Sequence, residues 1–223
     1  MSITKPINPN TYKITGCFCD DQFKLCLIHI YKNASLAMRN AMNMRGKYFE
    51  YDEVKDKNLI KICCFRDPIS RIISSYSYML NPREADHNHL DQHPINITKK
   101  TLFYEEKDNV IDSFNYFLDA IDGGNFYDAV TYPQYKFLED KGLTIDDIDE
   151  IIIQSSIVND FDRIKSKYNI KGNLDFVNRT DSNKKKLIEY YIYNNKQVYE
   201  RILNLYKEDF DLYEIAKEKM NNI

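Results

Sequence analysis

A lysine that directly follows an apolar segment is the first feature of this sequence that could do chemistry. Leu25 to Tyr31 form a continuous apolar run, as expected for a strand covered on both faces. Lys32-Asn33-Ala34 then leads into Ser35 to Arg45, which is rich in alanine and methionine and is followed by Gly46, a residue that often ends helices. The pattern predicts a strand, a short turn and a helix. Free backbone N–H groups at a helix start, together with one lysine, form an anion site.

The turn lacks the glycines of the P-loop that binds nucleoside triphosphates. That motif reads G-x-x-x-x-G-K-[ST]. The chain has six glycines, and none lies between Gly16 and Gly46. A turn this short suits a phosphate or phosphosulfate group better than a triphosphate wrapped by backbone amides.

An arginine and a serine in a second strand-to-helix unit could bind another phosphate. Leu59 to Phe65 are predicted to form a buried strand, and Asp67-Pro68 supplies a helix N-cap and a proline at the first helical position. Arg66 leaves the strand end and can present its guanidinium group to a phosphate. Ser74, two turns into the helix, could donate its hydroxyl to the same phosphate.

The spacing of apolar residues predicts which face of this second helix is buried. The apolar positions recur at intervals of three and four and comprise Ile69, Ile72, Ile73, Tyr76, Met79 and Leu80. We expect the opposite, polar side to carry Ser70, Arg71, Ser74 and Ser75.

The remaining pattern predicts an α/β fold. Two strand-to-helix units about 35 residues apart indicate parallel strands joined by right-handed crossovers. Further predicted elements are helices at 110–121 and 159–168, strands at 150–154 and 174–177, a long loop at 81–108, and two helices between 181 and about 219. We therefore expect a three-layer, P-loop-like domain with a central parallel sheet flanked by helices and a helical C-terminus. A single domain is expected over residues 1–223, with its core at about 25–213.

Composition excludes some classes of protein. The 223 residues include 31 basic and 34 acidic side chains, and this balance argues against bulk nucleic-acid binding. The first residues lack the apolar core of a signal peptide, and no stretch approaches the ~20 apolar residues of a membrane span. Five cysteines without a C-x-x-C pair make zinc and disulfide frameworks poor interpretations. We expect buried, reduced thiols in a cytoplasmic protein.

Together, the two phosphate motifs resemble those of the sulfotransferases that use 3′-phosphoadenosine 5′-phosphosulfate (PAPS), especially the carbohydrate branch. The family's 5′-phosphosulfate loop typically reads I-H-I-P-K-x-A-G/S-x-S, and Ile28 to Ala37 read I-H-I-Y-K-N-A-S-L-A. The family's 3′-phosphate motif, R-D-P-x-x-R-x-x-S-x-Y, matches residues 66–76 at each defined position. Weaker matches are Tyr132-Pro133-Gln134, Asn178-Arg179-Thr180 and 205–210, so that the resemblance spans about residues 25–213.

The resemblance implies sulfuryl transfer from PAPS to an acceptor hydroxyl, most readily on a glycan, with no metal required. Lys32 would contact the 5′-phosphosulfate and neutralise charge on the leaving oxygen. Amides of Asn33, Ala34 and Ser35 would hold the 5′-phosphate, while Arg66 and Ser74, with Arg179 as a further contact, would hold the 3′-phosphate. Candidates for the base that takes the acceptor proton comprise His87, His89, His93, Asp128 and Glu50. The histidines rank first because an unperturbed imidazole titrates near neutrality.

Three positions depart from the family pattern. Tyr31 replaces the usual proline, Ala37 replaces a small hydroxyl residue, and Val130 stands where a related D-x-H-W-x-P-Q segment has histidine. Two alternatives therefore stay open: a nucleotide or small-molecule kinase with a degenerate phosphate loop, and a non-catalytic module that binds the nucleotide. The loop histidines could bind a divalent metal, but no cysteine or acidic pattern completes such a site. His29, inside an apolar strand, is expected to be a packed histidine and not a catalyst.

Overall fold

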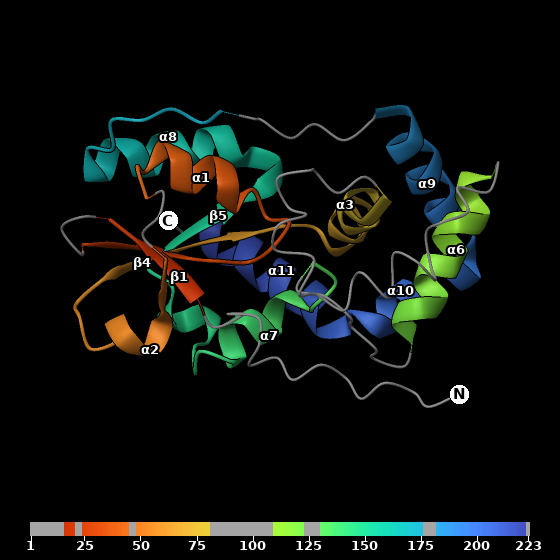
Figure 1. Ribbon diagram of the computed structural model, residues 1–223, viewed down its shortest axis with the longest axis horizontal. Coiled ribbons are helices and arrows are strands. Elements are labelled where there is room, and N and C mark those ends of the chain that lie inside the picture. Colours follow the sequence, from red (N-terminus) through yellow and green to blue (C-terminus); the bar gives the residue numbers. More distant parts are fainter. Residues whose placement is uncertain are drawn as a thin grey trace. The chain divides into compact units, whose positions relative to one another are not determined.

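Figure 1 shows the fold of the chain in a computed structural model. It describes residues 16–20, 24–44, 48–80, 109–122, 130–175 and 182–221. The chain divides into two compact units built from alternating segments. The sheet unit comprises residues 12–68, 133–178 and 208–223, and the helical unit comprises 1–11, 69–132 and 179–207. The expectation of one domain over residues 1–223 stays a prediction.

A five-stranded mixed sheet forms the centre of the sheet unit. Its strands are β1 (Gly16–Cys19), β2 (Leu25–Ile28), β3 (Tyr48–Glu50), β4 (Ile60–Phe65) and β5 (Glu150–Ile153), in the order β3-β1-β2-β4-β5. Strands β2, β4 and β5 run parallel, whereas β1 is antiparallel to both β2 and β3. The α/β class is confirmed, and its parallel strands are the three predicted apolar runs. The expected central parallel sheet is correct for β2, β4 and β5 and wrong on the β1–β3 side, where two short antiparallel strands were not predicted.

Helices lie on both faces of this sheet. Figure 1 shows α1 (Ser35–Ala41) and α8 (Ile157–Tyr168) on one face, with α2 (Tyr51–Val54) and α7 (Gln134–Glu139) on the other. Short 3₁₀ helices at Ile145–Asp147 and Gln154–Ser156 flank β5, and α11 (Lys207–Asn221) completes the unit. Between the sheet, α1 and α8 lies an apolar cluster that includes Leu27, Met38, Ile62, Ile152 and Phe161, all at most 1% exposed. Burial of such side chains is the main stabilising contribution to the unit.

Several predicted boundaries shift for local reasons. Helix α1 ends at Ala41, not near Gly46, because Asn43 adopts the left-handed conformation (φ 55°) that ends helices. Leu174 and Asp175, expected to begin a strand, lie in none, and the rest of that prediction falls outside the described residues.

The described part of the helical unit is built from four helices. These are α3 (Pro68–Leu80), whose first residue belongs to the sheet unit, α6 (Val110–Ile121), α9 (Ser182–Asn194) and α10 (Lys196–Leu205). The predicted helix at 110–121 is confirmed. The two helices expected between 181 and 219 are three, because the Asn195 side chain accepts a hydrogen bond from the Val198 amide and starts α10 separately. None of the described helices combines the length and the apolar character needed to cross a membrane.

The apolar face of α3 is buried as predicted at Ile69, Ile72, Ile73 and Tyr76. The prediction that Arg71 and Ser75 lie on an exposed polar side is wrong, since they are 2% and 1% exposed. The Arg71 guanidinium donates to the Tyr132 carbonyl at 2.7 Å, and the Ser75 hydroxyl donates to the Val130 carbonyl at 2.5 Å. Burial is tolerated because both polar groups gain backbone acceptors.

A buried carboxylate holds the start of β5 to α8. Glu150 is 1% exposed and accepts hydrogen bonds from Arg163 (2.6 Å), Lys167 (2.5 Å) and the Tyr168 hydroxyl (2.7 Å). Burial opposes ionisation of Glu150, but the three donors outweigh it and hold the pKa of this carboxyl below its ordinary value.

We expect Glu150→Gln to lower the free energy of unfolding by about 1–3 kcal/mol, because neutral acceptors bind charged donors more weakly. Urea denaturation at neutral pH measures this change. Glu139→Gln, whose side chain is 64% exposed, is the matched control and should change stability little. Equal effects of the two substitutions would contradict the prediction.

The effect of Glu150 should also depend on pH. Because its pKa is lower in the folded chain, its contribution to stability is complete above the unfolded pKa and is lost as pH falls through the folded one. The stability difference between wild type and Glu150→Gln should therefore shrink in acid. Urea denaturation of both proteins across an acidic pH series checks this, and a constant difference would contradict it.

Candidate anion-binding site at the edge of the parallel strands

The turns that follow β2 and β4 lie at one edge of the sheet. The two strands are parallel neighbours, with Ile28 beside Cys63, so their carboxyl ends point the same way. The Arg66 guanidinium (Nη1) donates to the Lys32 carbonyl at 2.8 Å. The structure thus brings Lys32 and Arg66, each predicted to bind a phosphate group, together in the sheet unit.

The backbone of the first turn has an alternating conformation. Lys32 (φ 68°) and Ala34 (φ 57°) are both left-handed, and Asn33 between them is not. Residues other than glycine rarely adopt this conformation, which costs about 1–3 kcal/mol each unless the surroundings impose it. Alternation of this kind points successive N–H groups into a concave anion-binding nest.

Two side chains of the turn hold it from within. Asn33 is 1% exposed, and its amide nitrogen donates to the Cys64 carbonyl (2.8 Å) and to Gln134 Oε1 (2.6 Å). The Ser35 hydroxyl donates to the Ile30 carbonyl at 3.0 Å. These contacts fix the turn to β4 and to the residues that follow β2, so Asn33 and Ser35 can face an anion through their backbone only.

Gln134 joins the two turns. Its Oε1 accepts from the Arg66 amide (3.1 Å) as well as from Asn33, and its Nε2 donates to the Arg66 carbonyl (2.8 Å). The side chain is fully buried. The Pro133-Gln134 pair belongs to a weak match to the family, but Gln134 was not predicted as a site residue. The Pro133-Gln134 pair was the one feature of the sequence noted above that could have pointed to Gln134.

Asp209 at the start of α11 holds Gln134 in turn. This carboxylate, 0% exposed, accepts from the Gln134 amide (2.8 Å) and the Tyr135 amide (2.9 Å). It therefore caps the first turn of α7, where backbone N–H groups have no helical partner. Asp209 also stood within a weak family match, residues 205–210, without being predicted as a site residue.

The structure does not test the other predicted contacts. Ser74 is half-buried on α3 in the helical unit, whereas Lys32 and Arg66 belong to the sheet unit. Arg179 and four of the candidate bases, His87, His89, His93 and Asp128, lie outside the described residues. Their roles stay predictions.

Glu50, the fifth candidate base, lies at the same end of the sheet as the Lys32 turn. On β1, Gly16 pairs with Glu50 of β3, and the next residue, Cys17, pairs with Ile28 at the end of β2. Its side chain accepts from the Glu53 amide as the N-cap of α2, and Glu53 accepts from the Glu50 amide at 3.2 Å. Glu50 thus has a structural role that its sequence position did not reveal.

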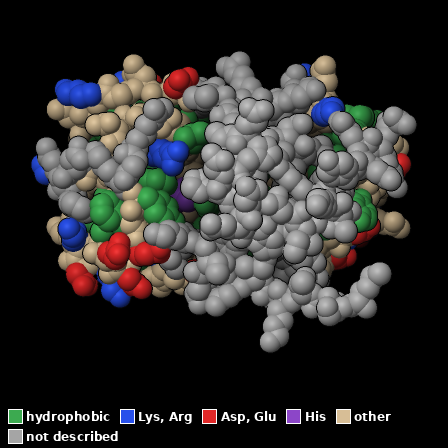
Figure 2. All heavy atoms as spheres, in the orientation of Figure 1, with side chains coloured by type: hydrophobic (Ala, Val, Ile, Leu, Met, Phe, Trp, Pro, Cys, Tyr) green, Lys and Arg blue, Asp and Glu red, His purple; other side chains and the backbone are tan. Residues whose placement is uncertain are grey.

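A pocket of about 240 Å³ adjoins Glu50. Its lining comprises Glu50, Tyr51, Asp52, Glu53, Asp140 and Lys141. Figure 2 shows acidic side chains gathered on the face that carries α2, where Asp52 and Glu53 are exposed. An acidic mouth repels a phosphate or sulfate group, so this pocket is not the predicted anion site.

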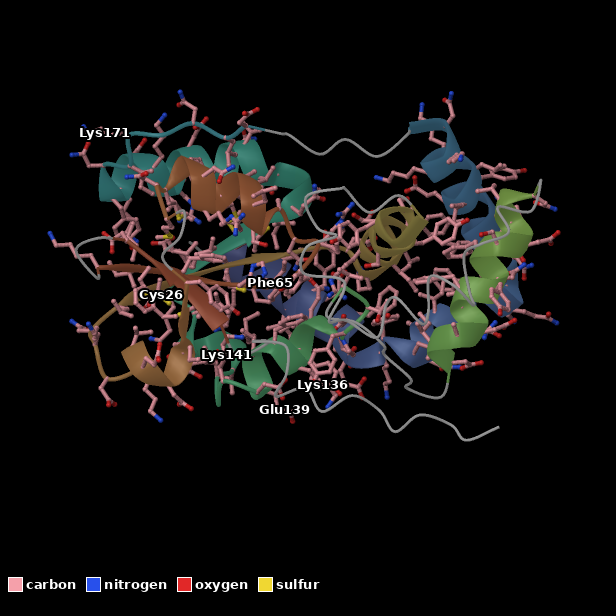
Figure 3. All side chains as sticks on the ribbon, viewed as in Figure 1. Cys26, Phe65, Lys136, Glu139, Lys141 and Lys171 are labelled. Atoms are coloured by element: carbon pink, nitrogen blue, oxygen red, sulfur yellow. The ribbon has the colours of Figure 1, made fainter. Side chains whose placement is uncertain are left out.

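Lys141 in this pocket is a chemical group that sequence analysis missed. It follows α7, is 8% exposed, and its ammonium donates to the Phe137 carbonyl at 2.8 Å (Figure 3). Burial lowers the pKa of Lys141 to about 8. No pattern in the surrounding sequence separates it from the many exposed lysines.

His29 packs against aromatic rings, as the sequence predicts. His29 contacts the rings of Phe18 and Tyr31, with centroids 5.2 and 4.4 Å away. Burial lowers the pKa of His29 to about 3 and keeps the imidazole neutral, as expected for a packed histidine. Val130, which stands where the related segment has histidine, is also buried, at 3% exposed.

No protein-family model matches the chain, and neither a curated protein nor a solved structure gives a significant match. The resemblance to sulfotransferases therefore depends on the two motifs themselves.

We expect Gln134→Glu to destabilise the sheet unit, because a carboxylate cannot donate to the Arg66 carbonyl and would be buried against the Asn33 amide and the Arg66 backbone, which carry no positive charge. The expected loss is about 2–4 kcal/mol in urea denaturation. Gln197→Glu, at an exposed position of α10, is the control. A loss below that of the control would show that the Gln134 bridge is not required.

Proposed function

We propose that this chain is a sulfotransferase that moves a sulfuryl group from PAPS to an acceptor hydroxyl, most readily on a carbohydrate, on a P-loop-like α/β fold. The observation that carries the proposal is the 2.8 Å hydrogen bond between Arg66 Nη1 and the Lys32 carbonyl. It supports a common site for the two motifs that resemble the family's 5′-phosphosulfate loop and 3′-phosphate motif.

The chemistry of these groups fits the donor. PAPS carries negative charge at both ends, and the edge of the sheet offers a nest of backbone N–H groups, an ammonium from Lys32 and a guanidinium from Arg66. PAPS would supply the sulfuryl group. The amides of Asn33, Ala34 and Ser35 would bind the 5′-phosphate, and Lys32 would stabilise the charge left on it when the bond to sulfur breaks.

The acceptor hydroxyl must lose its proton as its oxygen bonds to sulfur. Glu50 lies at the same end of the sheet as the Lys32 turn, which supports it as a candidate base, although its capping of α2 competes with this role. His87, His89, His93 and Asp128 stay the other proposed bases, and Arg66, Ser74 and Arg179 the proposed 3′-phosphate contacts. We further propose a cytoplasmic location and no metal requirement for transfer.

Ligand-dependent stabilisation distinguishes the proposal from a kinase. We expect 3′,5′-adenosine bisphosphate to raise the melting temperature without magnesium. At a concentration of 100 times its Kd, the ligand should stabilise the folded chain by about 2.7 kcal/mol. ATP with magnesium should give no comparable shift. The reverse pattern would favour the kinase, and bisphosphate binding without sulfate transfer to a panel of glycans, phenols and peptides would favour a non-catalytic module.

Lys32→Ala should abolish transfer of labelled sulfate, with a loss of at least about 100-fold in kcat, because the charge on the leaving group is no longer neutralised. Lys24→Ala is the matched control, because Lys24 is an exposed lysine at the opposite end of the same strand. It should retain wild-type turnover. Wild-type turnover in Lys32→Ala would refute the mechanism.

Arg66→Lys should weaken bisphosphate affinity about 10-fold or more, because an ammonium cannot reproduce the planar fork of a guanidinium. Calorimetric titration with 3′,5′-adenosine bisphosphate measures this loss. Lys24→Arg, which alters an exposed cation at the far end of β2, should leave the affinity unchanged. Unaltered affinity in Arg66→Lys would exclude a bidentate contact.

A further inference from the structure

Three cysteines on one face of the sheet come together in the β1–β2 ribbon. Cys17 and Cys19 are two residues apart on β1 and so share a face, and Cys26 on β2 is the direct cross-strand partner of Cys19. The three sulfur atoms all lie within 4.8 Å of one another, and all three side chains are 0% exposed. The spacing of the cysteines in the sequence does not predict this group, because strand pairing and not a C-x-x-C turn brings its members together.

We propose that Cys17, Cys19 and Cys26 form a tri-thiolate site for a thiophilic metal ion, with zinc(II) favoured over copper(I). Thiolate ligands select these soft ions. With Zn–S bonds of about 2.3 Å, tetrahedral ligands are separated by about 3.8 Å. The observed separations need to contract by no more than about 1 Å, which side-chain rotation within the ribbon can supply.

Charge balance favours the divalent ion. Three thiolates and Zn²⁺ leave one negative charge, whereas three thiolates and Cu⁺ leave two. The buried ammonium of Lys141 acts electrostatically on Cys17 and Cys26 from the same side of the sheet, and Figure 3 shows Cys26 in the sheet and Lys141 after α7. One lysine therefore neutralises the zinc complex, and burying a net charge would otherwise be costly.

Neither a disulfide nor simple apolar packing accounts for all three cysteines as a metal site does. A disulfide joins two cysteines, and Cys17 and Cys19 on one strand have Cα atoms about 6.6–6.8 Å apart, at the limit for a disulfide. All five described cysteines are free. Packing alone gives no reason for three thiols to cluster, because an apolar residue of similar size would fill the same space without a polar S–H group.

A bound metal ion would stabilise the pairing of β1 with β2, next to the parallel strands. Since the ligands are fully buried, metal should enter as the ribbon folds, and binding free energy should add to folding free energy. This role is independent of the proposed sulfotransferase activity.

The test uses the full chain, unfolded under reducing conditions and refolded with zinc(II) in one arm and with copper(I) in the other. We expect about one equivalent of zinc to remain after dialysis and to raise the melting temperature. X-ray absorption of the zinc-loaded wild type should show three sulfur neighbours at about 2.3 Å. Retention of copper(I) alone would keep the site but reverse the metal preference.

Cys17→Ser, Cys19→Ser and Cys26→Ser should each weaken zinc affinity by at least about 100-fold in competition with a chelator. Cys63→Ser is the matched control, because Cys63 is also fully buried in the same sheet but lies on β4, outside the cluster. It should retain the affinity of the wild type.

Three results would overturn the proposal. They are retention of neither metal, fewer than three sulfur neighbours in the wild-type spectrum, and equal losses of affinity in Cys19→Ser and Cys63→Ser. The wild-type spectrum and stoichiometry decide the matter even if a serine variant fails to fold.

Discussion

The edge of the sheet unit depends on one buried amide. Gln134 pairs with both the N–H and the carbonyl of Arg66 and also accepts from Asn33, so one side chain fixes the exits of two neighbouring strands. In the interior, each such polar group is stabilising when paired and costs about 1–3 kcal/mol when it loses its partner. The geometry of the Lys32 turn and of Arg66 is therefore determined by α7, a helix that lies elsewhere in the sequence.

This arrangement explains how the chain maintains a strained turn. Two non-glycine residues in the left-handed conformation would relax in an isolated peptide. Here Asn33 is anchored to β4, Ser35 to Ile30 just beyond β2, and the Lys32 carbonyl to Arg66. The turn is consequently preorganised, with its N–H groups oriented before any anion arrives. Preorganisation of this kind is what electrostatic catalysis requires.

Sequence reasoning was sufficient where local patterns determine the structure. The apolar runs Leu25–Tyr31 and Leu59–Phe65 predicted two parallel strands, and the periodicity of residues 110–121 predicted α6, because burial of a continuous face is encoded locally. It failed where the partner is distant. Arg71 and Ser75 were expected on a polar surface, yet both are buried and donate hydrogen bonds to the carbonyls of residues 132 and 130, respectively. Nothing near position 71 encodes that acceptor.

The same limit applies to the site. Lys32 and Arg66 were predicted from the motifs that contain them, but Gln134 and Asp209 owe their importance to a contact between residues distant in the sequence, and Lys141 owes its importance to burial. The strands β1 and β3 were missed because four and three residues are too few for a clear alternation. With them, the grouping of Cys17, Cys19 and Cys26 was missed as well.

The contact of Asp209 with the start of α7 joins residues 75 positions apart, across a segment that belongs to the other unit. During synthesis on the ribosome, α7 therefore emerges well before the carboxylate that caps it. The sheet unit can reach its final order only after α11 begins to emerge, and the nascent chain must keep β4 and β5 from aggregating until then.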